Sequence, residues 1–227
     1  MKAAIKRIIN KDIKTISDLK KNNIYLEFDE ENLLNAKALI IGPKDTIYFG
    51  GLYFFNIEFP TNYPHVPPTL IYKSSSNIRI HPNMYVNGKV CLSILGTWRG
   101  PPWTSSMDIS CILLSLQSLL TNSPLVNEPG FEKYTGPISN DYKTIVEYEN
   151  IKAHFYNNTI NIPEGFLLFQ NIINQNYINN KDIILKKIKK SGKGKDHFSL
   201  GINMYRIKIN IQYNKLYWLI KNYNISK

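Results

Sequence analysis

The residues with the clearest chemical potential are a cysteine, a histidine and an asparagine that lie within eleven positions of one another. Cys91 follows Asn83 by eight residues, and Asn83 ends a His81-Pro82-Asn83 tripeptide. A thiolate attacks acyl carbon readily, so Cys91 suits covalent acyl transfer. The Asn83 amide can donate a hydrogen bond to an oxyanion, or it can support the loop that carries Cys91. These residue types indicate acyl transfer with Cys91 as the nucleophile.

Other interpretations of these side chains stay open at this point. A free cysteine is often a buried structural residue, and Cys111, which lies among apolar residues of a predicted helix, fits that interpretation. His81 also suggests a Cys–His protease, although no further Asn or Asp is arranged to orient it. Two cysteines exclude a disulfide framework and a four-thiolate zinc site, so we expect no metal and a reducing compartment.

The elements that must position these residues can be predicted from hydrophobic spacing. Residues 3–20 place isoleucines at helical intervals between charged residues, which predicts an amphipathic helix. Four short segments rich in β-forming residues then predict an antiparallel meander at 24–28, 36–41, 52–59 and 69–73. The cysteine lies in a long irregular stretch, 74–103, and loops of that length inside a domain are usually functional.

The second half of the sequence is mainly helical in its pattern. A helix is predicted to begin at Met107 or Asp108, and another to cover 139–156. Two further helices are predicted at 164–179 and 181–190, separated near Asn179-Asn180, with a linker at 191–195. Residues 203–223 fit a strand or a helix. We therefore expect an α/β (α+β) catalytic domain over 1–150, with a mostly helical extension over 151–227 packed on it or tethered to it.

The net charge of +11 is unevenly distributed along the chain. Residues 1–150 have a net charge of +1, whereas residues 151–227 have a net charge of +10. A lysine-rich segment can bind nucleic acid or an acidic protein surface. Arginine, which is favoured for phosphate recognition, occurs in the extension only as Arg206, so nucleic acid is not the partner we expect.

The motifs between residues 42 and 131 resemble, in type and order, those of the ubiquitin-conjugating enzyme family. The most specific part is the His-Pro-Asn tripeptide with a cysteine eight residues after the asparagine. The other matching segments are Gly42-Pro43, Phe59-Pro60, Tyr63-Pro64-His65-Val66-Pro67-Pro68, Gly88-Lys89-Val90-Cys91-Leu92, Trp98 and Trp103. The resemblance covers roughly residues 1–150. It implies that family's α/β core, with an N-terminal helix, a four-stranded antiparallel meander and C-terminal helices.

Within the family, the sequence is similar to the Z-type conjugating enzymes. The stretch from Cys91 to Trp103 is about four residues longer than in the commonest members, and Asn127-Glu128-Pro129-Gly130 follows the second predicted helix. The family associates the Z-type members with the alternative ubiquitin-activating enzyme. Giant conjugating enzymes and hybrid conjugating–ligating enzymes share the Gly-Thr-Trp and Asn-Glu-Pro-Gly signatures, so those subtypes are the neighbouring alternatives.

The resemblance implies a transferase that works through a thioester. Cys91 accepts ubiquitin or a ubiquitin-like modifier from an activating enzyme and passes it to a lysine or to a ligase. RING and HECT ligases are the ligase partners that the resemblance implies. Asn83 supports the oxyanion or the loop, and His81 and Pro82 are structural. No cofactor is implied, because the activating enzyme uses the ATP. Contact with that enzyme is expected from Lys6, Arg7 and Lys11, which are three of the basic residues of the first predicted helix.

Three departures from the family pattern bear on the chemistry. Ser93 replaces an aspartate two residues after the cysteine, as in the Z-type. Val126 or Asn127 stands where an acidic residue often gates the incoming lysine, and Glu128 is the nearest acid. The positions that usually anchor a RING ligase are polar here, which predicts weak or altered ligase pairing. They are His65, Thr104, Ser105 and Ser106.

The remaining expectations concern the setting of the protein. The first residues lack an apolar stretch of signal-peptide length, and the longest near-apolar run, 111–120, is too short for a membrane span. We expect a monomer in the cytoplasm and also in the nucleus, with no membrane contact. The contrasting function is a non-catalytic adaptor of the ubiquitin pathway or a basic nucleic-acid-binding protein on the same fold.

Overall fold

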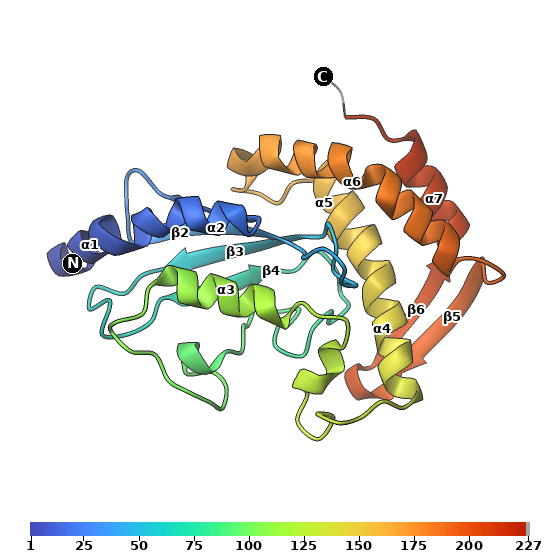
Figure 1. The fold of residues 1–227 in the computed structure, drawn as a ribbon, viewed down its shortest axis with the longest axis horizontal. Helices are drawn as coiled ribbons and strands as arrows, with labels where there is room; N and C mark the ends of the chain where they lie inside the picture. The colour runs from blue at the N-terminus through green and yellow to red at the C-terminus, as the bar shows by residue number, and fades with distance from the viewer. Residues whose placement is uncertain (226–227) are drawn as a thin grey trace.

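The computed structural model describes residues 1–225. It opens with a continuous helical segment and continues into a four-stranded antiparallel sheet in the order β1-β2-β3-β4, which confirms the predicted meander (Figure 1). The helical segment consists of α1 (Lys2–Arg7), η1 (Ile8–Asp12), η2 (Ile13–Thr15) and α2 (Ile16–Lys21). The strands are β1 (Ile24–Phe28), β2 (Asn35–Ile41), β3 (Leu52–Glu58) and β4 (Thr69–Lys73).

The outer face of the sheet is covered over part of its area, and the alternation of side chains along β2 and β3 divides them between two apolar clusters. Ala38, Ile40, Tyr53 and Phe55 belong to the main core. Their neighbours on the other face form the second cluster, which is completed by residues of the extension: Leu39, Ile41, Leu52, Phe54, Phe166, Phe169 and Ile173. Burial of both faces explains why residues 52–55 are apolar without a break.

Helix α3 (Ile109–Leu119) packs its apolar side on the main core. The backbone N–H of Ser110 donates to the Asp108 carboxylate at 3.0 Å, so Asp108 caps the helix, which begins at the next residue. The N-terminal segment is joined to the same helix end through the buried Asp12, which accepts hydrogen bonds from Ile109 N–H at 2.8 Å and from the Tyr63 hydroxyl at 2.6 Å. The long stretch before α3 contains the short η3 (Ser93–Leu95), and η4 (Pro124–Asn127) follows the helix.

A long helix connects the sheet with the extension. It consists of α4 (Pro137–Glu149), η5 (Asn150–Asn157) and α5 (Asn158–Ile160), and it runs without interruption through residue 150. Tyr148 of this helix is buried and meets Tyr213 of the extension edge to face, with ring centroids 5.6 Å apart. Residues of the extension thus contact the part of the helix that precedes residue 151. Where a separate catalytic domain ends along this helix stays a prediction.

The extension itself consists of η6 (Leu167–Phe169), α6 (Gln170–Ser191), β5 (His197–Ile202), η7 (Asn203–Tyr205), β6 (Ile207–Gln212) and α7 (Tyr213–Asn222). The predicted break at Asn179-Asn180 is wrong, because α6 continues through both residues. Asparagine is a weak helix former, but the Asn176 side chain donates to the Gly50 carbonyl at 2.8 Å and Asn180 donates to Asn176 at 2.8 Å. These bonds hold the asparagines inside the helix.

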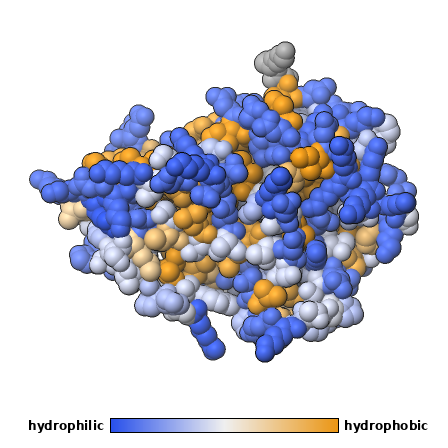
Figure 2. Space-filling model, in the orientation of Figure 1, coloured by the Kyte–Doolittle hydropathy of each residue, from blue (hydrophilic) through white to orange (hydrophobic). Residues whose placement is uncertain are grey.

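Residues 203–223 contain both a strand and a helix, which are the two structures that their pattern allowed. Strands β5 and β6 form an antiparallel hairpin, and α7 follows directly and packs against α6. The hairpin lies beside α4, and its turn lies near the loop that leads into that helix (Figure 1). Hydrophilic residues cover much of the extension on the face shown in Figure 2. The exposed lysines of the extension within the described residues are Lys186, Lys189, Lys190, Lys193, Lys195, Lys208, Lys215 and Lys221.

Candidate active site

Cys91 and Asn83 are joined by two hydrogen bonds. The Cys91 backbone N–H donates to the Asn83 carbonyl at 2.9 Å, and the Asn83 side-chain amide donates to the Cys91 carbonyl at 2.8 Å. Both residues are buried, and the Asn83 Oδ1 atom has no hydrogen-bond partner. Asn83 therefore supports the loop directly, while one of its two amide hydrogens is not used by this bond.

His81 is a neutral, structural member of the tripeptide. Its Nδ1 accepts from the Asn83 backbone N–H at 3.0 Å, and its Nε2 lies 3.1 Å from the Leu119 carbonyl oxygen, which is the arrangement of a neutral ring that donates from Nε2. Complete burial lowers the pKa of His81 to about 3. With Nδ1 already occupied by Asn83, this ring is not available to take a proton from Cys91.

The thiol itself is enclosed. Cys91 is only 2% exposed, so an acyl group from another protein reaches it only after neighbouring side chains move. Thr97 holds the backbone around Cys91: its hydroxyl donates to the Val90 carbonyl at 2.9 Å and accepts from the Leu92 N–H at 2.9 Å. In the sequence Thr97 stands only within the Gly-Thr-Trp signature, and its support of the Cys91 loop was not predictable, because a single threonine in an irregular loop gives no spacing signal.

Cys111 lies in a different environment from Cys91. It is partly buried on α3, and its Sγ lies 3.9 Å from Asp108 Oδ1 at the N-terminal end of that helix. No group of three His, Cys, Asp or Glu side chains in residues 1–225 is arranged to hold a metal ion. Within the same residues, no helix combines the length and apolar character needed to cross a membrane.

The segment after α3 lies next to the tripeptide. Asn127 Nδ2 is 3.5 Å from His81 Nε2, and Val126 is exposed. Glu128 is not a free carboxylate: its Oε2 accepts a hydrogen bond from the Tyr205 hydroxyl at 2.5 Å and lies 3.9 Å from the Arg79 guanidinium. The nearest acid to the expected gate position is thus already paired with two side chains, one of which belongs to the extension.

The basic residues of the first helix differ in their availability. Arg7 donates to the Met107 carbonyl at 2.6 Å, and Lys11 donates to the Ser106 carbonyl and lies 3.6 Å from Asp108 Oδ2. These two side chains hold the loop before α3 against the helix. Lys6 is exposed and makes no such contact in the described part of the chain. Of the three residues expected to contact the activating enzyme, only Lys6 is classed as exposed.

The expected ligase-contact residues lie in two loops that are tied together. The indole N–H of Trp103 donates to the Pro64 carbonyl at 2.7 Å, directly before His65. Trp103 therefore holds its loop in place. His65 and the three polar residues after Trp103 are all exposed: Thr104, Ser105 and Ser106.

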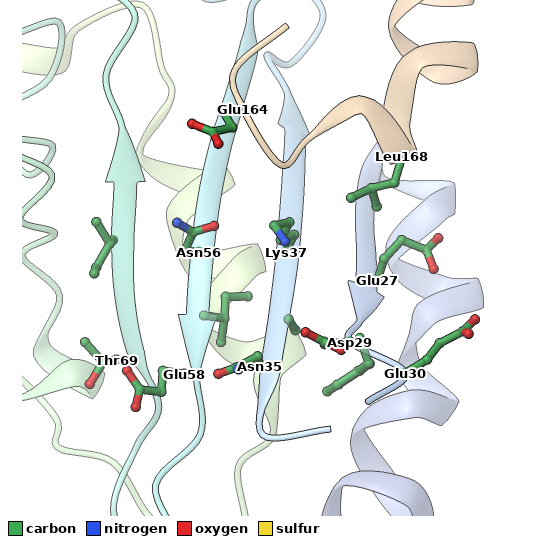
Figure 3. Close-up of a pocket in the computed structure, with 14 residues that line it drawn as sticks. Glu27, Asp29, Glu30, Asn35, Lys37, Asn56, Glu58, Thr69, Glu164 and Leu168 are labelled. Carbon is green, nitrogen blue, oxygen red and sulfur yellow. The ribbon is translucent and has the colours of Figure 1, made fainter. Parts of the chain in front are cut away.

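A hollow on the outer face of the sheet is separate from this site. Figure 3 shows that residues of all four strands line it and that Glu164 and Leu168 of the extension lie along one side. Its charged lining residues are five acidic side chains and one lysine, Lys37. Neither Cys91 nor the tripeptide contributes to it. The acidic side chains are Glu27, Asp29, Glu30, Glu58 and Glu164.

Comparison with known proteins finds ubiquitin-conjugating enzymes among the relatives of this chain. Residues 8–151 match the family described as ubiquitin-conjugating enzyme. The "Ubiquitin-conjugating enzyme E2 Z" proteins of Danio rerio and Homo sapiens are each 42% identical over 148 residues, which is 64% of this chain. That alignment covers 45% and 42% of those proteins, so this chain spans less than half their length.

A solved structure supports the same fold. The E2 domain of a Toxoplasma gondii ubiquitin conjugating enzyme has a TM-score of 0.51 at 22% sequence identity. The match covers 65% of this chain and 99% of that domain. The portion of this chain that remains outside it corresponds in size to the extension.

Proposed function

Because this chain belongs to the ubiquitin-conjugating enzyme family, we propose that Cys91 accepts ubiquitin, or a related modifier, as a thioester. The Cys91 thiolate attacks the carbonyl carbon of the modifier's C-terminal glycine, which is held as a thioester on an activating enzyme. A bond from Cys91 sulfur to that carbon forms, the bond to the activating enzyme's cysteine breaks, and the departing sulfur takes up a proton.

Transfer to a lysine completes the reaction. The neutral amine attacks the Cys91 thioester, an amide bond forms, Cys91 leaves as a thiolate and the amine loses its extra proton to solvent. Alternatively, a cysteine of a ligase accepts the acyl group by another thioester exchange. No cofactor of the chain itself takes part, because ATP is used by the activating enzyme. The modifier, the activating enzyme and the ligase are defined here only by this chemistry.

The observation that best supports the proposal is the paired hydrogen bonding between Cys91 and Asn83. These bonds join the Cys91 backbone to Asn83, and the bond within the tripeptide and the bonds of Thr97 support the same loop. Such preorganisation is what acyl transfer needs and what a structural cysteine does not. The buried histidine has no free nitrogen for general-base work, which argues against a Cys–His hydrolase.

The test is a charging reaction with a panel of modifiers and both ubiquitin-activating enzymes. We expect an ATP-dependent adduct on a non-reducing gel that disappears with reductant. Cys91→Ala removes the adduct, and Cys111→Ala, the matched control, retains it. An adduct that persists in Cys91→Ala would refute the site, and the absence of any adduct across the whole panel would favour the non-catalytic adaptor.

A further inference from the structure

Tyr205 lies in η7, the turn between β5 and β6, and its side chain contacts residues that precede the extension. Its hydroxyl donates to Glu128 Oε2 at 2.5 Å, across 77 positions of sequence. Its ring meets the Tyr142 ring edge to face, with centroids 5.4 Å apart. The turn that presents Tyr205 is defined by Arg206 in the left-handed region (φ 53°) and by the buried pair Ile202 and Ile207 on either side.

Arg79 lies between this tyrosine and the active-site tripeptide. Its guanidinium carbon lies 3.7 Å from the centroid of the Tyr85 ring and 4.5 Å from the centroid of the Tyr205 ring. The same guanidinium donates to the carbonyl of Pro82, whose peptide bond leads into Asn83. The Arg79 side chain is 18% exposed, and its backbone carbonyl accepts from the Tyr142 hydroxyl at 2.8 Å. Partial exclusion of water strengthens such cation–π and charge-assisted contacts.

Glu128 contacts both Tyr205 and Arg79. It pairs with Arg79 at 3.9 Å and receives the Tyr205 hydroxyl, so Tyr205 and Arg79 together fix the carboxylate. Glu128 belongs to the segment that carries Val126 and Asn127, and Asn127 approaches His81. Burial and the bond to Glu128 raise the pKa of Tyr205, so the hydroxyl stays protonated and remains a donor.

We propose that Tyr205 is a positioning residue for transfer to lysine. Resting on the proposed function, this role makes the extension a part of the catalytic apparatus. Tyr205 contacts both Arg79 and Glu128 and fixes their side chains. Arg79 in turn binds the Pro82 carbonyl, and Glu128 fixes the 124–128 segment beside His81. The lysine that attacks the Cys91 thioester needs both the Asn83 amide and this segment at fixed positions. Transfer of the modifier from the activating enzyme to Cys91 depends less on the 124–128 segment than transfer to lysine does.

The experiment compares Tyr205→Phe with Tyr217→Phe. Tyr217 is a tyrosine of the same extension whose hydroxyl makes no hydrogen bond within the described residues, and it is therefore a matched control. Each variant is charged with the modifier, ATP is removed, and loss of the thioester is followed with free lysine and, separately, with free cysteine. Thermal unfolding of each variant is measured in parallel.

We expect Tyr205→Phe to charge like the unmodified chain and to discharge to lysine about tenfold more slowly. Its discharge to cysteine and its melting temperature should be nearly unchanged, and Tyr217→Phe should match the unmodified chain throughout. If Tyr205 acts through Glu128, Glu128→Gln slows the lysine reaction similarly, and Tyr205→Phe adds little in that background.

Several results would overturn the proposal while leaving thioester formation on Cys91 intact. Equal lysine discharge by Tyr205→Phe and Tyr217→Phe would do so. Equal slowing of the lysine and cysteine reactions together with a lowered melting temperature would show a structural role only. A charged chain that transfers to cysteine but never to lysine would also contradict it. Failure of charging itself would instead refute the proposed function, so the two outcomes are distinguishable.

Discussion

The Asn83 side chain donates its hydrogen bond to the backbone carbonyl of Cys91, 2.8 Å away, and not to the thiol. The amide therefore fixes the loop before any acyl group arrives. The same amide has a second hydrogen that can serve an oxyanion, so support of the loop and stabilisation of charge are compatible in one residue. The geometry gives the supporting role a direct physical basis.

Replacing Asn83 tests that role. In Asn83→Ala the Cys91 carbonyl loses its side-chain partner, and we expect a loss of roughly 1–2 kcal/mol in the free energy of unfolding. Lysine discharge should slow by about 10² or more, because the loop and any oxyanion contact are both affected. Urea denaturation and single-turnover discharge measure the two effects. Unchanged stability with slow discharge would assign Asn83 to the oxyanion alone.

Phe166 tests whether the extension is part of the folded core. Its side chain is completely buried against Phe54 of β3, with ring centroids 5.0 Å apart, and the adjacent Leu167 is 64% exposed. We expect Phe166→Ala to lower the free energy of unfolding by about 3–5 kcal/mol. The matched control Leu167→Ala should change it by less than about 0.5 kcal/mol. Similar values for both, from denaturant unfolding, would mean that the extension does not contribute to the core.

Because His154 is buried, we expect the free energy of unfolding to fall in acid. Burial lowers the pKa of His154 to about 3, below the ordinary value of 6.5, so the unfolded chain binds a proton that the folded chain does not. Stability is therefore lost as pH falls from about 6.5 toward 3, by about 1.4 kcal/mol per pH unit for each such histidine. His81 adds a second contribution of the same sign.

The measurement is the free energy of unfolding between about pH 6 and pH 5, where most carboxylates stay ionised. His154→Gln should reduce the slope by about half, because one of the two buried histidines is removed. His197→Gln changes an exposed histidine of the hairpin and should leave the slope as it is. An unchanged slope in His154→Gln would contradict the assignment.

The polar loops around Trp103 predict weak stimulation by RING ligases. His65 is exposed where an apolar anchor is expected, and Thr104, Ser105 and Ser106 are exposed as well. We expect several unrelated RING domains to accelerate thioester discharge little, and His65→Phe to increase their effect. His197→Phe, which adds an equally exposed aromatic elsewhere, is the control. Strong stimulation of the unmodified chain by these RING domains would refute this prediction.

The sheet and the active-site loop were predictable because their signals are local. Strand positions follow from β-forming residues between turns, and the four predicted strands agree with the structure to within one residue at each end. Asp108 combines a favourable capping residue type with the start of an apolar helical period. The tripeptide and the cysteine are recognisable because their spacing is specific.

The contacts of the extension were not predictable, because they join residues far apart in sequence. The continuity of α6 depends on the bond from Asn176 to Gly50, 126 positions away, which outweighs the weak helix propensity of asparagine. Strand β5 was not predicted, since Gly201 interrupts its β-forming residues. Tyr205, Arg79 and Glu128 have no pattern in common, and only the placement of the hairpin brings them together.

The most direct test of thioester formation at Cys91 is the chemical nature of the adduct in Cys91→Ser. A serine at this position forms an ester in place of a thioester, so the ATP-dependent adduct should resist thiol reductant and break in mild alkali. The unmodified chain should give an adduct that reductant removes, and Cys111→Ser should behave in the same way. An adduct of Cys91→Ser that reductant still removes would show that the acyl group is carried by another cysteine.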